Sequence, residues 1–263
     1  MSVLSSGPRA SLLTVSDICL RFGGVVALDG VSFTVERGTV CGLIGPNGAG
    51  KTTLFNCLSG LCRADSGAIV FNGRSLFDLP PHVIASIGIG RTFQNPALFD
   101  TMTARENVTI GGQCRSSGGI LASMLRLPSV RREENALAQR TDALLESLAL
   151  RSYADRPVIE LTFATRKRIE LARALAGRPK LLLLDEPAGG LSHEEVDRFC
   201  DLIAWARDKF EATVLLVEHH MNMVVRVSDK VVVLNFGRKI AEGTPAEVQR
   251  NQEVVEAYLG QAS

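Results

Sequence analysis

With 263 residues, the chain is long enough to bury a substantial core, as one large domain or two small ones. Its residues are 46% hydrophobic, 22% charged and only 5% aromatic, which is typical of an ordinary globular protein. A net charge of +1 excludes a global electrostatic argument for binding nucleic acid or a membrane surface.

No segment of the sequence predicts a membrane span or a secretory leader. Met1 to Thr14 contain no long apolar core, and the longest apolar runs, around Leu181–Leu184 and Val231–Leu234, have the length of strands. A membrane role would therefore come through a partner. The six cysteines show no metal-ligand spacing, so we expect reduced thiols in the core: Cys19, Cys41, Cys57, Cys62, Cys114 and Cys200.

The N-terminal part predicts β-structure followed by a strand and a helix. Short runs of β-branched residues from Leu12 to Val40 are punctuated by glycine turns and predict strands and hairpins. Thr39–Ile44 predicts a buried strand, which leads through a glycine loop into an amphipathic helix at Lys51–Leu61. Gly67–Phe71, followed by an Asn-Gly turn, predicts part of a further hairpin.

Later segments alternate between helices and strands. Leucines recur at helical spacing within Glu133–Leu150 and predict an amphipathic helix, whereas Gly111–Ser129 is loop-like. Buried apolar strands alternating with helices imply a largely parallel sheet covered on both faces, an α/β fold in one domain with insertions. The other predicted helices are Arg166–Ala176, Glu194–Lys209, Met221–Val227, Pro245–Gln249 and Glu253–Leu259, and the other strands are Leu181–Leu184, Thr213–Val217 and Lys230–Asn235.

A glycine-rich segment between a predicted strand and a predicted helix has the pattern G-x-x-x-x-G-K-[ST]. Glycine lets the backbone wrap a phosphate without a side-chain clash, and the N–H groups of the helix N-terminus point at it. In this pattern Lys51 reaches the β- and γ-phosphates, and the Thr52 hydroxyl ligates Mg²⁺. A chance glycine-rich turn is the alternative, which the strand–loop–helix context disfavours. The segment comprises Gly45, Pro46, Asn47, Gly48, Ala49, Gly50, Lys51, Thr52 and Thr53.

The predicted strand Leu181–Leu184 ends in two carboxylates, Asp185 and Glu186. Asp185 can hold Mg²⁺ through water, and Glu186 can polarise an attacking water molecule as a general base. An acidic pair after a strand is by itself more often a solvated turn. The phosphate loop upstream favours the catalytic interpretation.

The phosphate loop, Gln94, Leu161–Thr165, the Asp185-Glu186 pair and His219 occur in the order and spacing of an ABC nucleotide-binding domain. The chain resembles that family over nearly its whole length. The resemblance implies an ATPase with ATP and Mg²⁺ as cofactors. It also implies a P-loop NTPase (RecA-like) core with an antiparallel β subdomain and an inserted helical subdomain.

The same resemblance sets the expected domain boundaries. A flexible N-terminal lead-in occupies residues 1–11, and a single ABC nucleotide-binding domain occupies residues 12–260. The helical subdomain is inserted at roughly 96–175. No second domain is expected.

Three residues receive roles only through this resemblance. Phe22 looks like the aromatic residue that stacks on adenine, with a plain core phenylalanine as the alternative. Gln94 resembles the glutamine that touches Mg²⁺ or the attacking water and senses the membrane partner. His219 resembles the switch histidine that contacts the γ-phosphate. His220 is its rival, but His219 directly follows the strand-end residue Glu218.

A finer resemblance is to the ATP-binding subunits of branched-chain amino acid importers. Urea and short-chain amide importers use near relatives of these subunits. The stretches that carry the resemblance are Arg21–Gly24, Arg91–Asn95, Glu170–Leu175, Glu242–Pro245 and the ending Ala257–Gly260.

The chain departs from the family in the signature loop, which normally reads Leu-Ser-Gly-Gly-Gln and here is Leu161–Thr165. In the family this loop caps the γ-phosphate of the ATP held by the opposite subunit. Thr162 keeps a hydroxyl and Ala164 keeps its N–H, but a methyl group replaces a glycine and the following amide side chain is lost. Ser192 also replaces the usual acidic residue or asparagine that communicates across the dimer.

These departures predict a heterodimer, in which a second ABC ATPase subunit supplies an intact signature loop. The resemblance further implies two transmembrane permease subunits as partners, and a periplasmic or extracellular substrate-binding protein indirectly. The expected location is peripheral, at the cytoplasmic face of the cell membrane. No nucleic-acid partner is expected.

Other functions remain as alternatives. Asp185 and Glu186 favour a hydrolysing subunit, whereas Ala164 and Thr165 favour a regulatory half that binds ATP and turns it over weakly. A non-transport ABC protein acting on DNA or ribosomes usually carries two cassettes or long coiled coils, and neither is present. A small P-loop kinase or GTPase would leave Phe22 and the other family motifs unexplained, and there is no Asn-Lys-x-Asp segment.

Overall fold

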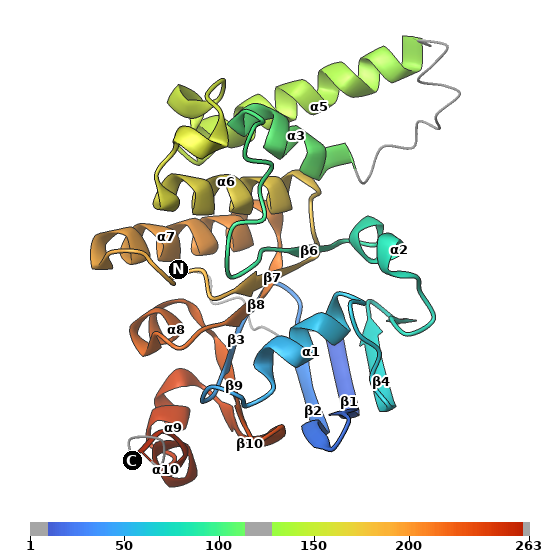
Figure 1. The fold of residues 1–263 in the computed structure, drawn as a ribbon, viewed down its shortest axis with the longest axis vertical. Coiled ribbons are helices and arrows are strands. Elements are labelled where there is room, and N and C mark those ends of the chain that lie inside the picture. Colours follow the sequence, from blue (N-terminus) through green and yellow to red (C-terminus); the bar gives the residue numbers. More distant parts are fainter. Residues whose placement is uncertain (1–9, 114–127, 260–263) are drawn as a thin grey trace, which may run out of the picture.

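The computed structural model describes residues 10–113 and 128–259, which form two β-sheets with helices around them (Figure 1). The strands are β1 Ser11–Phe22, β2 Val25–Glu36, β3 Val40–Ile44, β4 Ser66–Phe71, β5 Arg74–Ser75, β6 Ile89–Arg91, β7 Leu181–Asp185, β8 Thr213–Val217, β9 Lys230–Asn235 and β10 Arg238–Gly243. The helices are α1 Lys51–Leu58, α2 Pro81–Ser86, α3 Ala104–Gln113, α5 Pro128–Ser147, α6 Phe163–Ala176, α7 His193–Phe210, α8 Met221–Val227, α9 Pro245–Gln249 and α10 Gln252–Leu259, with 3-10 turns η1 Arg151–Tyr153 and η2 Val158–Glu160.

The larger sheet has six strands in the order β10-β9-β3-β8-β7-β6. Strands β9 to β6 pair in parallel, and β10 pairs antiparallel with β9. Strands β3, β7 and β8 are buried at every position, as expected for a parallel sheet covered on both faces. Because parallel strands point the same way, their carboxyl ends meet at one edge, where open α/β sheets bind ligands.

Alternate residues of the central strands face two different cores. Leu181 and Leu183 pack with α1 and the smaller sheet, whereas Leu182 and Leu184 pack with α6 and α7. This alternation is the two-residue period of a strand. A third cluster, around Ile44, joins the sheet to α9 and α10. Both faces of the sheet are thus fixed by apolar packing.

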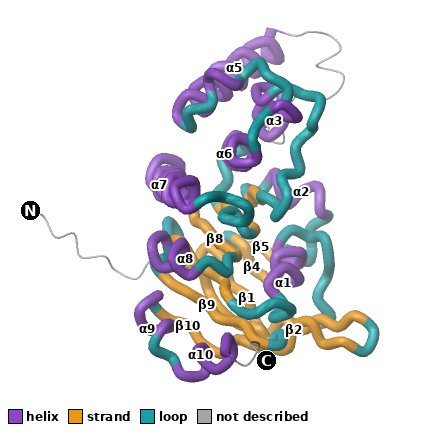
Figure 2. The backbone as a smooth tube through the Cα atoms, turned by 60° about the vertical axis from the view of Figure 1, so that its left-hand side comes forward, coloured by secondary structure: helices purple, strands orange, loops and turns teal. Residues whose placement is uncertain are grey.

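The smaller sheet is antiparallel, in the order β2-β1-β4-β5. It lies on the α1 side of the large sheet. Figure 2 shows α9 and α10 beside β10, whereas α3 and α5 lie at the opposite end, away from the strands, with α6 between them and the large sheet. These three helices come from the chain between β6 and β7. That part of the chain leaves the large sheet and returns to it.

The structure confirms most of the predicted elements. Strands β8 and β9 and helices α8 and α9 begin and end at the predicted residues. Helix α1 ends at Leu58 rather than at Leu61, because Gly60 adopts a left-handed conformation with φ +69°. Helix α6 begins before the predicted Arg166, because the Thr162 hydroxyl accepts a hydrogen bond from the Thr165 N–H and caps the helix.

Other predictions were wrong at their boundaries. The helix predicted at Glu133–Leu150 is α5, which starts earlier and ends at Ser147, before Ala149 turns left-handed with φ +53°. The loop predicted at Gly111–Ser129 overlaps α3 and α5 at its two ends, and its middle lies outside the described residues. Strand β1 begins at Ser11, inside the predicted lead-in. Strand β10 was not predicted, because its residues are polar or only half-buried.

No helix in the described part of the chain is both long and apolar enough to cross a bilayer.

The central strands set the stability of the nucleotide edge. Leu216 is fully buried in β8, so Leu216→Ala should lower the free energy of unfolding by about 2–5 kcal/mol, measured by urea titration. The matched control is Leu61→Ala, because Leu61 is 62% exposed; it should change the free energy by less than about 0.5 kcal/mol. Equal losses in the two variants would contradict the packing described above.

Candidate nucleotide-binding site

Three loops meet at the carboxyl edge of the six-stranded sheet. One follows β3 and contains Gly45–Thr53, one follows β7 and contains Glu186, and one follows β8 and contains His219. Strands β3, β8 and β7 are neighbours in the sheet. Gln94, from the segment after β6, reaches the same edge. Four segments that are far apart in the sequence therefore supply one site.

The loop after β3 depends on glycine at two close approaches of the backbone. A Cβ atom at Gly45 would lie 2.1 Å from the Leu234 carbonyl oxygen, and one at Gly50 would lie 2.6 Å from the Ala27 carbonyl oxygen. Gly48 has φ +77°, and nothing lies within 4 Å of the place where its Cβ would be. The loop is therefore tightly packed at its base and open at Gly48.

Lys51 lies across this loop. Its ammonium group donates hydrogen bonds to the carbonyl oxygens of Gly45 (2.7 Å) and Pro46 (2.9 Å), and the side chain is buried. Burial lowers the pKa of Lys51, and the charges of Glu186 and Asp185 act in the opposite direction. Helix α1, which Lys51 begins, has no side-chain cap and no acidic residue in its first turn. Unpaired N–H groups and a cation therefore gather where an anion would bind.

Two distant segments brace the phosphate loop. The Gly237 N–H, in the turn between β9 and β10, donates to the Ala49 carbonyl at 3.1 Å. The Gly237 carbonyl in turn accepts from the Asp29 N–H, in β2, at 2.8 Å. The loop is thus held between the last hairpin of the large sheet and the smaller sheet.

Asp185 is buried and paired with Arg91, whose Nη2 lies 3.0 Å from its Oδ2. The other terminal nitrogen of Arg91 donates to Asn56 Oδ1 and Ser59 Oγ, both at 2.9 Å. These two acceptors lie at the C-terminal end of α1, where a cation is electrostatically favoured. Arg91 therefore ties the Asp185 carboxylate to the helix that carries the phosphate loop.

Glu186 meets two of the other predicted residues. Gln94 Nε2 donates to Glu186 Oε2 at 2.8 Å, and His219 Nδ1 lies 3.8 Å from the same oxygen. The Glu186 backbone is left-handed, with φ +45°, which is rare for a residue with a side chain. Its N–H donates to the Val217 carbonyl at the end of β8. The structure therefore brings Glu186, Gln94 and His219 together.

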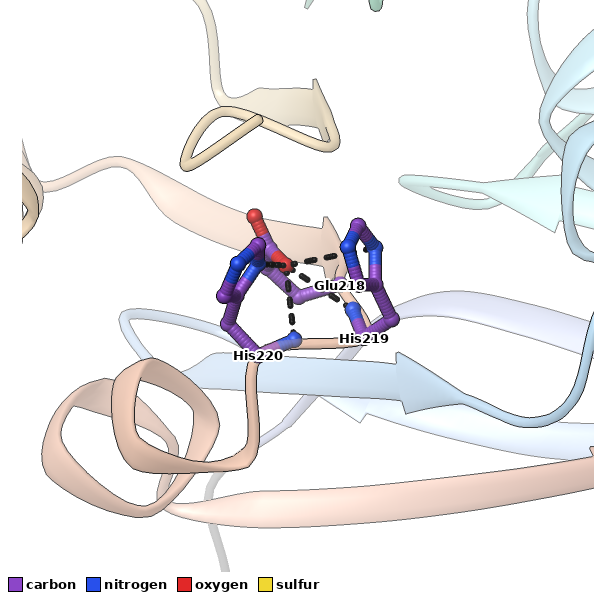
Figure 3. Close-up of side chains that lie close together, drawn as sticks. All are labelled: Glu218, His219 and His220. Carbon is purple, nitrogen blue, oxygen red and sulfur yellow. Dashed lines mark hydrogen bonds and ion pairs between the residues drawn. The ribbon is translucent and has the colours of Figure 1, made fainter. Parts of the chain in front are cut away.

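Glu218 orders the loop that carries both histidines (Figure 3). Its buried carboxylate accepts hydrogen bonds from the N–H groups of His219 (2.8 Å), His220 (2.9 Å) and Ala188 (2.8 Å). His220 Nδ1 lies 3.1 Å from Glu218 Oε2. These three side chains could surround a metal ion, but the Glu218 oxygens already serve as hydrogen-bond acceptors for the backbone. His220 turns to Glu218, whereas His219 also approaches Glu186.

The remaining predicted residues lie at two other places. Phe22 ends β1 and is 55% exposed, so its ring is available for stacking. Thr162 and Ala164 lie at the start of α6. The Thr162 hydroxyl is 2.9 Å from the Thr165 hydroxyl, and it caps the helix from within the chain. The hydrogen bonds of the Lys51 ammonium go instead to the carbonyls of Gly45 and Pro46.

Two residues of the site were missed by the sequence reasoning. Arg91 was named only as the first residue of the family-like stretch Arg91–Asn95, and Lys167 lay within the predicted helix Arg166–Ala176 without being assigned a role. Lys167 Nζ donates to the Gln94 carbonyl at 2.6 Å and approaches the Glu186 carbonyl at 3.4 Å. Their partners are far away in the sequence, so no local pattern could have revealed them.

Two models of protein families match this sequence. The model of the ABC transporter family matches residues 28–189, which include the phosphate loop and Glu186. The chain belongs to the ABC transporter family. It is a nucleotide-binding transport ATPase of that family. A second model, the branched-chain amino acid ATP-binding cassette transporter, matches residues 238–263.

Individual relatives match along nearly their whole length. The high-affinity branched-chain amino acid transport ATP-binding protein BraF of Pseudomonas aeruginosa is 42% identical over 251 residues, covering 95% of this chain and 98% of BraF. The high-affinity branched-chain amino acid transport ATP-binding protein LivG of Escherichia coli is 39% identical over 251 residues, covering 95% of this chain and 98% of LivG. A crystal structure of the ADP conformation of an ATP-binding cassette from an ABC transporter superposes with a TM-score of 0.83 at 33% identity, covering 95% of this chain and 99% of that chain.

The packing of the phosphate loop can be tested with two glycine variants. Gly45→Ala places a methyl group against the Leu234 carbonyl, so we expect nucleotide affinity to fall at least about ten-fold, equivalent to about 1.4 kcal/mol, in a fluorescent-nucleotide titration. Gly30→Ala is the matched control: Gly30 also has positive φ, +70°, but nothing lies near its Cβ position. It should lower stability by about 1 kcal/mol and leave affinity unchanged. Equal affinities would contradict the close approach.

Proposed function

We propose that this chain is the ATP-hydrolysing subunit of an importer for branched-chain amino acids. The hydrolytic part of the proposal is supported by one observation above all, the convergence of Lys51 and the Gln94–Glu186 pair at a single sheet edge. The substrate is supported by the match at residues 238–263 and by the names of BraF and LivG. Urea or short-chain amides would be the nearest alternative cargo.

In this proposal the nucleotide is held along the carboxyl edge. The adenine ring stacks on the exposed ring of Phe22, a contact worth about 1–3 kcal/mol. The triphosphate replaces the loop carbonyls as the partner of Lys51, and the N–H groups from Gly48 to Thr53 donate to its oxygens.

The residues of the site also fit a magnesium ion. Thr52, in the first turn of α1, offers a hydroxyl, while Asp185 offers a carboxylate and Gln94 an amide oxygen. These are the hard oxygen donors that Mg²⁺ prefers. When bound, the ion neutralises phosphate charge. Arg91 holds the Asp185 carboxylate by an ion pair and anchors it to the C-terminal end of α1.

Hydrolysis then uses the three residues that meet at Glu186. The Glu186 carboxylate accepts a proton from the attacking water, and Gln94, already 2.8 Å from it, orients that water. His219, whose Nδ1 lies 3.8 Å from the same Glu186 oxygen, contacts the γ-phosphate. Ordered donors around a developing charge are effective because they need no reorganisation during the reaction.

The divergent start of α6 supports a heterodimer. In Leu161–Thr165 the Thr162 hydroxyl is engaged as a helix cap, and Ala164 carries a methyl group where the family has glycine. Each charge-assisted hydrogen bond lost to a partner's γ-phosphate would be worth about 1.5–3 kcal/mol. The site built on Lys51 of this chain is therefore completed by a partner subunit with an intact signature loop. The partner's own site is the impaired one.

The chain energises transport through two permease subunits, to which it binds at the cytoplasmic face of the membrane. A substrate-binding protein outside the membrane contacts those permeases and not this chain. No nucleic acid takes part. Support for this assembly comes from the relatives, which are named as ATP-binding proteins of amino acid transport.

The proposed role of Glu186 as general base can be tested separately from the role of Lys51 in nucleotide binding. Glu186→Gln keeps the size of the side chain and removes the base, so turnover of ATP should fall about 100- to 10,000-fold while the Kd for ATP stays within about three-fold. Glu253→Gln, an exposed carboxylate on α10, is the control and should leave turnover unchanged. Lys51→Ala should abolish binding instead. Undiminished turnover in Glu186→Gln would remove Glu186 from its proposed role.

The heterodimer can be tested by mixing. The purified chain alone should hydrolyse ATP at least about ten-fold more slowly than when combined with an ABC subunit of the same importer that has an intact signature loop. In the mixture, Lys51→Ala in this chain should remove most of the turnover, whereas the equivalent change in the partner should remove little. Full activity of the chain alone would refute this part of the proposal.

A further inference from the structure

One face of helix α6 carries three charged residues at intervals of three, namely Lys167, Glu170 and Arg173. Residues three apart on a helix lie on the same face, one above another. All three side chains reach the segment after β6, Phe93–Ala97, which contains Gln94. We call this set of three residues the α6 clamp.

The clamp grips the backbone of that segment at both ends. Lys167 Nζ donates to the Gln94 carbonyl at 2.6 Å. Glu170 Oε1 accepts from the N–H groups of Phe93 (3.0 Å) and Ala97 (3.3 Å). Arg173 Nη1 donates to the Ala97 carbonyl at 2.6 Å. Contacts to backbone atoms fix where the segment lies, whatever its side chains are.

Two members of the clamp are buried. Lys167 is 2% exposed and Glu170 is 1% exposed, and burial shifts both pKa values toward the neutral forms. The charges of Glu170, Glu218, Asp185 and Glu186 oppose the shift at Lys167. Apolar side chains at these positions would often stabilise the fold as well as buried charges do, so stability alone does not explain the charges. Their hydrogen bonds point instead to a role in fixing the position of the Phe93–Ala97 backbone.

Lys167 also links this segment to Glu186. Its ammonium group lies 2.6 Å from the Gln94 carbonyl and 3.4 Å from the Glu186 carbonyl. The Gln94 amide in turn donates to the Glu186 carboxylate at 2.8 Å. The two residues are thus joined twice, once through their side chains and once through Lys167. On its other side the Lys167 ammonium lies 5.6 Å from the centre of the Phe163 ring, at the start of α6.

We propose that Lys167, supported by Glu170, is a positioning residue that holds Gln94 against Glu186. A displacement of α6 is then passed directly to the residues that act on the attacking water. The inference rests on the roles proposed above for Gln94 and Glu186. Lys167 itself touches neither phosphate nor water in this scheme, and acts only through the pair.

The test compares Lys167→Met, which keeps the length of the side chain, with Lys167→Arg, which keeps the charge. ATP turnover and ATP affinity are measured in the chain, assembled with its partner subunit. In Lys167→Met we expect kcat to fall about ten- to a hundred-fold, because small displacements of catalytic groups have effects of that size, and Kd to change less than about two-fold. Lys167→Arg should recover at least half of the lost rate. Lys180→Met, an exposed lysine next to β7, is the matched control and should have normal kinetics.

A second measurement distinguishes positioning from general destabilisation. If Lys167 acts through Gln94, then Lys167→Met should lower kcat less than about two-fold further in a Gln94→Ala background. A full additional loss in that background, or an unchanged kcat in Lys167→Met, would overturn the proposal. Should Lys167→Met fail to fold, Glu170→Gln replaces it, with an expected three- to ten-fold loss in kcat, about the effect of one weakened contact.

The outcome also separates this inference from the proposed function. If Glu186→Gln and Gln94→Ala both keep normal turnover, the proposed hydrolytic roles are wrong. If both lose turnover while Lys167→Met does not, those roles stand and only the role of the clamp is refuted.

Discussion

The hydrogen bonds from the Lys51 ammonium to the carbonyls of Gly45 and Pro46 hold the phosphate loop in its conformation, and the rest of the nucleotide site is built around that loop. A buried cation beside uncapped helix N–H groups needs negative charge or carbonyl oxygen close by. The loop supplies this by turning back over Lys51. Its packing against Leu234 and Ala27 leaves no room for a side chain at Gly45 or at Gly50.

At the carboxyl edge of the large sheet, the adjacent carboxylates of Asp185 and Glu186 have different surroundings and therefore different partners. Asp185 is buried and paired with Arg91, which anchors it to α1. Glu186 is less buried, in a left-handed conformation that turns it toward Gln94 and His219. One residue is therefore tied to the phosphate-loop helix, and the next meets Gln94 and His219, which places it for the general-base role proposed above. The parallel sheet makes this possible, since β7 ends between β6 and β8.

The sequence predicted those parts whose signals are local. Strands β8 and β9 are runs of apolar residues, and the phosphate loop combines glycines with a lysine at fixed spacing, so both were found. Strand β10 was missed, because its polar residues are held in a strand by pairing with β9. Lys167 was missed because a charge on an amphipathic helix normally faces solvent, and only the folded chain shows it buried against Gln94.

The bracing of the phosphate loop by Gly237 has a consequence for how the protein is made. The Ala49 carbonyl accepts its hydrogen bond from a residue close to the C-terminal end, and β3 itself is flanked by β8 and β9, which come late in the chain. A nascent polypeptide emerging from the ribosome has the loop sequence early but cannot complete its framework until β9 and the turn after it have been synthesised. Truncated translation products that end before Gly237 would therefore lack a finished nucleotide cradle.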